Sequence, residues 1–348
     1  MDTVTHALSG ALLARATAPN QARVSVAARV GAGFAACAFP DVDVVLTYIS
    51  PITYLTQHRG VTHSIFLAPV WALILAWVFA KLDRGTSWRD YFGVCALALS
   101  AHILGDLITS FGTMIYAPFS DSRVAWNTTF IIDLWFTGII VAGLAASVLW
   151  RRSRVPAAVA LGVLASYVGM QAWQRDRAID FGQSYATNSA LSGAEVSAIP
   201  RPVSPFNWTV IVTEGDRYHY ANVNLLRDTT AAPPALDAGL ITHLNAAYVP
   251  LENARWETVH KYGPDPDERE LAVNVLAHPK LDFYRWFARY PALYRIDRGN
   301  PQTCVWFEDL RFAIPGRDSF GFRYGLCGEN GDWRAFQLLD EQTKEAIE

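Results

Sequence analysis

The chain has 348 residues and a formal charge of −3, from 29 Lys or Arg and 32 Asp or Glu, which excludes the strongly basic balance of a nucleic-acid-binding protein. Hydrophobic residues make up 51% of the sequence, a high share for a soluble enzyme. The composition also excludes a collagen-like repeat and a disordered chain.

The charged residues are distributed unevenly along the chain. Residues 1–173 carry 19 of the 61 charged side chains and no Glu, whereas the remaining 175 residues carry 42. A charge-poor half next to a charge-rich half indicates two different solvents. We therefore expect a membrane domain over residues 1–175 and an aqueous domain after it.

Apolar stretches in the first half predict a mainly α-helical transmembrane bundle of about six segments. Four uncharged stretches come close to the roughly 20 residues that a helix needs to cross a bilayer. They cover residues 64–80, 91–105, 134–150 and 155–174. Two weaker candidates cover residues 3–18 and 30–49, the second broken at Pro40, Asp41 and Asp43. The alternative is four spans, with residues 1–50 as an amphipathic cap.

Basic residues in the loops predict the orientation of this bundle. With six segments, nine Lys or Arg residues fall on one side of the membrane, and only Arg59 and Arg123 fall on the other. The positive-inside rule then places the nine in the cytoplasm. We expect a multi-pass protein of the bacterial inner membrane type, with the C-terminal half on the extracytoplasmic side. The first segment lacks the basic start of a signal peptide, so we interpret it as retained.

Ionisable residues of the membrane half gather at one edge of the predicted bundle. Under the six-segment topology, the outer edge holds His6, Asp41, Asp43, His58, His63, His102, Asp106 and Asp133. Such groups are costly in a membrane and require a partner or a function. Each alone has a structural explanation, as a hydrogen-bonded His or a capping Asp. Their joint placement favours a site for Zn²⁺, Mn²⁺ or Fe²⁺, which bind nitrogen and oxygen ligands.

Local spacing supports this interpretation. His102 and Asp106 are four residues apart, which places both side chains on one face of a helix. His58 and His63 flank Gly60, where the backbone can fold back. Pro40 is expected to end or kink its segment.

Five short motifs carry a family resemblance. They read MDTVTH at 1–6, FPDVD at 39–43, HRGVTHS at 58–64, HILGD at 102–106 and TSFGT at 109–113. Over roughly residues 1–175 the chain resembles the YdjM-like family of membrane-bound metal-dependent hydrolases, which looks distantly akin to zinc-dependent phospholipase C and P1-type nucleases. The resemblance implies a helical membrane protein with a metal site and a hydrolase activity, but no substrate. The ligands that it implies are His6, Asp41, His58, His63, His102 and Asp106.

The expected chemistry is hydrolysis of a phosphoester or lipid-type substrate at the outer membrane edge by a metal-activated water. Two ions, Zn²⁺ foremost, would lie about 3.5–4 Å apart. Asp41, Asp43 or Asp133 could serve as the general base if it is not a ligand, and Asp43 or Asp133 could instead orient a ligand. Arg59 either orients an anionic substrate or forms a salt bridge with Asp41 or Asp43. Expected partners are membrane lipids and a small-molecule or lipid substrate, without nucleic acid.

Two other functions stay open at this point. One is a metal or proton transporter, which would need polar residues through the depth of the bilayer. The other is a non-catalytic membrane anchor, which needs no metal. No G-x-S-x-G or P-loop motif supports a serine hydrolase or an NTPase.

The second half reads as an extracytoplasmic α+β domain over residues 206–348, after a linker over 176–205. Alternating apolar residues predict strands at 208–213, 218–225, 303–313, 320–326 and 333–338. Residues 271–290 predict a helix that Pro279 breaks. Cys304 lies in one of these strands and Cys327 directly follows another, so the two could pair in an oxidising compartment, a question that the sequence leaves open.

Overall fold

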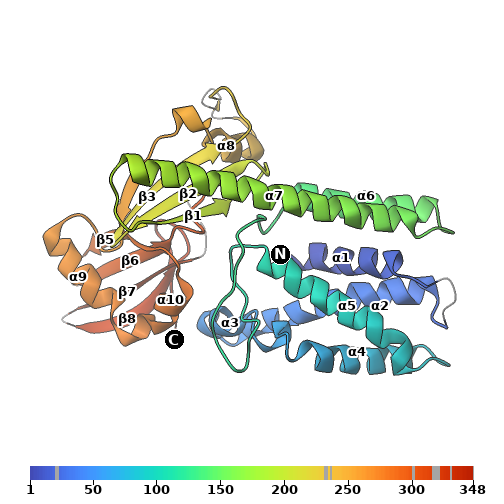
Figure 1. The fold of residues 1–348 in the computed structure, drawn as a ribbon. Coiled ribbons are helices and arrows are strands. Elements are labelled where there is room, and N and C mark those ends of the chain that lie inside the picture. The colour runs from blue at the N-terminus through green and yellow to red at the C-terminus, as the bar shows by residue number, and fades with distance from the viewer. Residues whose placement is uncertain are drawn as a thin grey trace. The chain divides into compact units, whose positions relative to one another are not determined.

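The structure is a computed structural model that describes residues 1–19, 23–230, 234–235, 237–299, 302–315, 322–329 and 331–347. The chain forms two compact units. The helical unit comprises Met1–Ile49 and Gln57–Trp173, and the sheet unit comprises Ser50–Thr56 and Gln174–Glu348. Figure 1 shows the elements of both units.

Helices and short 3-10 turns make up the helical unit and its connection to the sheet unit. In chain order they are α1 (Thr3–Ala16), α2 (Val26–Ala38), η1 (Phe39–Tyr48), α3 (Pro51–Gln57), η2 (Val61–His63), α4 (Ala68–Leu82), α5 (Trp88–Leu107), α6 (Leu134–Leu149) and α7 (Val155–Asn188). Helix α3 falls almost wholly in the sheet unit, and α7 runs through both.

Two helical segments of the described chain are long and apolar enough to cross a membrane. They are Val26–Tyr48 and Val155–Asn188, and a third arises if the bent pair Pro51–His63 and Ala68–Leu82 is one span. The other expected segments are also helical, but the structure does not confirm six spans. The predicted break at Pro40 is present, because α2 gives way to the 3-10 turns of η1 at Phe39.

The helical unit packs through small residues. A Cβ added at Gly10 would lie 2.2 Å from the carbonyl oxygen of Gly33, so α1 and α2 touch backbone to backbone. Ala36, Ala72 and Ala98 continue this close packing between α2, α4 and α5. The close contacts fix the register of the helices, which positions the polar residues at their ends.

The sheet unit contains two antiparallel sheets. The first has the order β1 (Glu195–Pro200), β2 (Asn207–Glu214), β3 (Arg217–Asn224) and β4 (Glu257–His260). The second has the order β5 (Pro291–Arg298), β6 (Thr303–Asp309), β7 (Arg323–Glu329), β8 (Asp332–Leu338) and β9 (Lys344–Ala346). The helical elements between the strands are α8 (Leu240–Ala246), η3 (Leu251–Asn253), α9 (Pro266–Leu276), η4 (Pro279–Leu281) and α10 (Asp282–Phe287).

The segment 176–205, expected to be a linker, is instead largely ordered structure. Helix α7 continues to Asn188, and β1 follows from Glu195. Ala178 is fully buried against the first sheet, and Phe181 packs in the same cluster. The expected linker began where the apolar run ends, but the helix continues as an amphipathic helix with one face on the sheet.

Several strand predictions match the structure within two residues, namely those for β2, β3 and β8. The predicted strand 303–313 ends earlier, at Asp309, and part of the predicted strand 320–326 lies outside the described residues. The helix predicted over 271–290 breaks at Pro279 as expected. Cys304 and Cys327 face each other across β6 and β7 and form a disulfide.

Candidate metal centre

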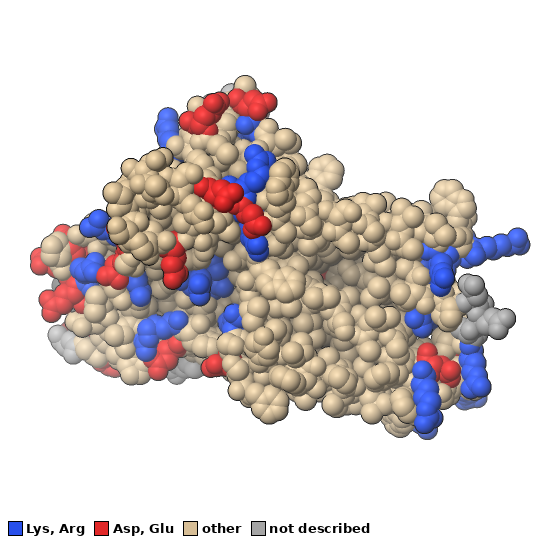
Figure 2. All heavy atoms as spheres, viewed as in Figure 1, with Lys and Arg blue, Asp and Glu red and all other residues tan. Residues whose placement is uncertain are grey.

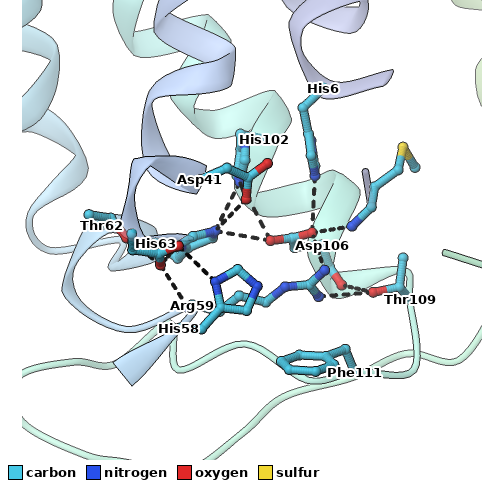
Figure 3. A network of polar contacts seen from close by, with 12 residues as sticks. His6, Asp41, His58, Arg59, Thr62, His63, His102, Asp106, Thr109 and Phe111 are labelled. Carbon is cyan, nitrogen blue, oxygen red and sulfur yellow. Dashed lines mark hydrogen bonds and ion pairs between the residues drawn. The ribbon is translucent and has the colours of Figure 1, made fainter. Parts of the chain in front are cut away.

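Four donor atoms from three elements converge inside the helical unit (Figure 3). Nε2 of His63 lies 2.9 Å from Nε2 of His102, and Oδ2 of Asp106 lies 3.1 Å from the first and 3.5 Å from the second. Oδ1 of Asp41 lies 3.7 Å from Nε2 of His63 and 3.6 Å from that of His102. All four side chains are buried.

These distances fit a metal ion. A tetrahedron with metal–ligand bonds of about 2.0–2.1 Å has edges of about 3.3 Å, and the five separations above lie on both sides of this value. Oδ2 of Asp106, one of the four converging donor atoms, is buried and accepts no hydrogen bond. A buried carboxylate oxygen without a partner is costly, and a cation would satisfy it. The donor set therefore suits a divalent ion.

Local structure explains how each donor reaches this point. Asp41 follows Pro40 in η1, where the tighter 3-10 turns begin. His63 ends η2, directly before the chain turns into an extended conformation at Ser64. His102 and Asp106 lie one turn apart in α5, as their spacing predicted.

Neighbouring groups orient the two imidazoles. Nδ1 of His102 lies 2.6 Å from the carbonyl oxygen of Cys37, to which it can only donate. This hydrogen bond leaves Nε2 of His102 with a free lone pair directed at the cluster. Nδ1 of His63 lies 2.9 Å from Oγ1 of Thr62, so its Nε2 is also directed at the other donors.

His6 extends the cluster on the other side of Asp106. Its Nε2 lies 3.0 Å from Oδ1 of Asp106, and its ring stacks on His102 at 3.7 Å. His6, Cys37 and His102 form a second group of possible ligands. Gly105 makes this approach possible, because an added Cβ there would lie 2.9 Å from Cε1 of His6. The Met1 amino group also contacts Oδ1 of Asp106.

His58 and Asp43 form a separate pair beside the four donors. Oδ1 of Asp43 lies 2.7 Å from Nδ1 of His58. Oδ2 of Asp43 accepts hydrogen bonds from the Arg59 backbone N–H at 3.0 Å and from Thr62 Oγ1 at 3.2 Å. His58, implied as a ligand by the family resemblance, belongs to neither group of converging donors among the described residues. Asp43 organises the loop that carries both His58 and His63.

The Arg59 side chain is buried and pairs with Asp106. Its Nη2 lies 2.9 Å from Oδ1 of Asp106, and its Nη1 donates to Oγ1 of Thr109 at 3.1 Å. The guanidinium also lies over the Phe111 ring. The salt bridge expected with Asp41 or Asp43 is thus made with Asp106. The sequence analysis therefore named the wrong carboxylates as the salt-bridge partners of Arg59.

Asp133 caps a helix. Its Oδ1 accepts from the backbone N–H groups of Trp135 and Phe136, at the start of α6. Its Oδ2 accepts from the Tyr167 hydroxyl at 2.8 Å and from the Gln171 amide at 2.9 Å. The first two contacts give Asp133 the capping role considered for it, and the contacts with Tyr167 and Gln171 join the start of α6 to α7.

Three contributors to the site had no clear sequence signal. Cys37 acts through its backbone carbonyl, which no motif reports. Thr109 and Phe111 lie inside the TSFGT motif, but nothing in the motif predicts contact with Arg59. The loop that contains them is held against the site by a hydrogen bond from the Met114 N–H to the Arg59 carbonyl.

Comparisons with known proteins support the membrane assignment. A profile of the family described as YdjM inner membrane protein matches residues 1–178. The chain is 28% identical over 130 residues to the uncharacterized protein YfhP of Bacillus subtilis strain 168, a match that covers 37% of this chain and 39% of that protein. The chain thus spans about two fifths of that relative's length. No solved structure matches it significantly. Because the family match covers more than half of the chain, the protein belongs to the YdjM inner membrane protein family.

Proposed function

We propose that this protein is a membrane-bound metal-dependent hydrolase that acts on a phosphoester or lipid-type substrate. The single observation that carries the proposal is the group formed by His63, His102, Asp41 and Asp106, whose donor atoms are spaced like the ligands of one ion. The kinship with zinc-dependent phospholipase C and P1-type nucleases stays a prediction.

Two imidazoles and two carboxylates favour Zn²⁺, with Mn²⁺ and Fe²⁺ as alternatives. Such an ion, when bound, lowers the pKa of a coordinated water toward neutrality and polarises a phosphoryl or acyl oxygen. The second group of possible ligands, His6, Cys37 and His102, supports the proposal of a second ion.

The chain's own residues supply proton transfer and positioning. Oδ1 of Asp43 lies 2.7 Å from Nδ1 of His58 and so orients this imidazole beside the four donors. In this proposal His58 is the general acid or base and Asp43 sets its tautomer. Arg59 fixes the orientation of Asp106 through their ion pair, so that Oδ2 of Asp106 faces His63.

We further propose a six-segment topology with the metal centre on the extracytoplasmic side. Figure 2 shows a belt of uncharged atoms along the helical unit and blue Lys and Arg side chains gathered at its end. The exposed basic residues of this end come from the loops after α1, α4 and α6, and include Arg23, Arg84 and Arg152. Their number supports a cytoplasmic location for this end. The Cys304–Cys327 disulfide fits an oxidising compartment for the sheet unit.

The completeness of the donor set favours a second candidate, a metal site without catalytic activity. Four protein ligands fill a tetrahedron, which is typical of structural zinc sites, whereas catalytic sites keep one position open. The exposed fraction of the Asp41 side chain is 8%, and those of His63, His102 and Asp106 are 0%. A structural ion would stabilise the helical unit, and the site would then have no hydrolytic activity.

Elemental analysis and turnover together separate these candidates. The detergent-purified full chain is compared with His63→Ala and with the control His243→Ala, whose imidazole lies in the sheet unit. We expect stoichiometric zinc, manganese or iron in the wild type and the control, and its loss in His63→Ala. Metal-dependent cleavage of phosphodiesters or phospholipids identifies a hydrolase. Bound metal without turnover on phosphoester and acyl-ester substrates identifies the structural site, and absence of metal in the wild type refutes both.

A further inference from the structure

A groove of about 660 Å³ lies at the basic end of the helical unit, between α1, α2 and α6. Its wall is formed mainly by aliphatic side chains, among them Leu8, Val26, Val30, Val141, Leu144 and Val148. Arg15 and Arg151 line the same groove. The groove therefore combines a long apolar wall with cationic groups.

The wall of the groove is open to the surroundings of the helical unit. The exposed fractions of Val26, Val141 and Val148 are 45%, 49% and 58%. In a protein of an inner membrane family, exposed aliphatic side chains on apolar helices such as α2 and α6 are expected to contact lipid chains. An apolar groove in such a surface is suited to an acyl chain.

Arg15 brings a buried positive charge that no carboxylate of the described residues neutralises. Its Nη2 donates to the carbonyl oxygens of Arg151 at 2.9 Å and Ser153 at 2.6 Å, both of them neutral. Among the described residues no carboxylate forms an ion pair with Arg15, and the three residues 20–22, which lie outside that set, are Asn, Gln and Ala. The charge therefore attracts an anion to this end of the groove.

Two neighbouring arginines, Arg29 and Arg154, also donate to backbone carbonyl oxygens. Arg29 donates to the carbonyl oxygens of Ala14 and Thr17, and Arg154 donates to that of Ala18. The guanidinium groups hold the helix C-terminus and the loops of this end together, yet they leave its positive charge in place. Charge complementarity thus calls for an anionic ligand rather than a neutral one.

We propose that the groove binds one anionic phospholipid, with its phosphate at Arg15 and Arg151 and an acyl chain along α1, α2 and α6. Guanidinium groups bind phosphate oxygens through charge-assisted hydrogen bonds, and basic pockets between membrane helices suit anionic head groups. A soluble phosphate could contact the same two arginines, but unlike a phospholipid it would not contact the aliphatic wall of the groove.

This lipid site is separate from the metal centre. His6 lies in the first half of α1 and Arg15 in its last turn, nine positions or about 14 Å along the helix axis. The inference therefore does not depend on hydrolysis. A phospholipid in the groove is a bound lipid and not the proposed substrate.

Native mass spectrometry of the full chain, delipidated in detergent and titrated with phosphatidylglycerol or phosphatidylcholine, tests the proposal. Arg151→Gln removes one cation of the groove, Val141→Trp fills the aliphatic wall, and Arg84→Gln is the matched control, a basic residue of the same end that does not line the groove. We expect one phosphatidylglycerol to bind with a preference over phosphatidylcholine. Loss of the charge-assisted contact in Arg151→Gln should weaken its binding about tenfold. Val141→Trp should weaken both lipids, and Arg84→Gln should leave both nearly unchanged.

Two results would overturn the proposed lipid site. Equal affinity for the two lipids, or equal losses in Arg151→Gln and Arg84→Gln, would show a diffuse surface attraction and overturn the site. Competition by glycerol phosphate at the same concentration as phosphatidylglycerol would show a soluble-phosphate site and overturn the lipid assignment. Metal content, measured on the same samples, should be the same in all variants, which distinguishes this test from that of the hydrolase.

Discussion

Nε2 of His102 lies 2.9 Å from Nε2 of His63, although the two residues are 39 positions apart in the sequence. Nδ1 of His102 already donates to a backbone carbonyl, so its Nε2 presents a lone pair. Oδ2 of Asp106 lies within 3.5 Å of both nitrogens. Lone pairs and a carboxylate gathered in one buried place could hold a cation, which supports the proposed metal site.

Removal of metal should destabilise the protein. A ligand that binds only the folded state stabilises it by about 4 kcal/mol at one thousand times its Kd. We expect chelation with EDTA to lower the melting temperature of the detergent-purified chain, and one equivalent of Zn²⁺ to restore it. Differential scanning calorimetry measures both steps. An unchanged melting temperature after verified metal removal would contradict the proposed role of the ion.

Gly105→Ala should disturb the cluster without changing any of its functional groups. The added Cβ would lie 2.9 Å from Cε1 of His6, so the ring must move off Asp106 and His102. We expect a loss of stability of about 1–3 kcal/mol from overpacking, together with weaker metal binding. Isothermal titration of Zn²⁺ into the apoprotein measures the affinity.

Gly93→Ala is the matched control for this substitution. Gly93 lies on the same helix, α5, and an added Cβ there meets nothing within 4 Å. Because Ala favours helix over Gly, the control should be neutral or slightly more stable, by up to about 1 kcal/mol. Equal effects of the two substitutions on metal affinity would count against contact between His6 and the site.

Asp106→Asn should be the most damaging isosteric change in the helical unit. The carboxylate pairs with Arg59 and faces His63, His102 and His6, and Arg59 is itself buried. Breaking a buried ion pair leaves an uncompensated charge and costs about 3–5 kcal/mol. We expect loss of metal and a lower unfolding midpoint. Asp121→Asn, at an exposed position of the same unit, should change neither quantity.

The Cys304–Cys327 disulfide should stabilise the sheet unit. It closes a chain segment with a sequence separation of 23 residues. A loop of this size corresponds to about 3 kcal/mol of stabilisation in the chain-entropy description. The double variant Cys304→Ser, Cys327→Ser should therefore unfold more readily, as followed by limited proteolysis of the sheet unit. Cys37 and Cys95 are free and buried, so thiol labelling before and after reduction should show two additional reactive groups after reduction.

The sequence predicted the parts of the site that depend on local spacing. His102 and Asp106 share a helix face because they are four residues apart, and Pro40 changes the helix type just before Asp41. Periodicity does not report how helices pack. The close backbone contact between Gly10 and Gly33 determines which side chains of α1 and α2 meet. This contact cannot be predicted from the sequence, because each glycine is only one small residue within an apolar segment.

Some strands of the sheet unit could not be predicted from the sequence. Strand β4 has two exposed and two half-buried residues, and β9 is fully exposed, so neither has the apolar alternation that identified β2 and β3. Strand β1 lies within the segment 176–205, which was predicted to be a linker, and it pairs with β2 over its whole length. Strands β1, β4 and β9 lie at sheet edges. An edge strand forms its hydrogen bonds with a neighbouring strand, and its own sequence does not show which segment that neighbour is.

X-ray absorption spectroscopy at the metal edge of the purified full chain tests the central claim most directly. The account predicts a bound divalent ion with nitrogen and oxygen ligands at about 2.0–2.1 Å and an imidazole contribution that disappears in His63→Ala. A spectrum dominated by sulfur at about 2.3 Å, or one that is unchanged in His63→Ala, would contradict it.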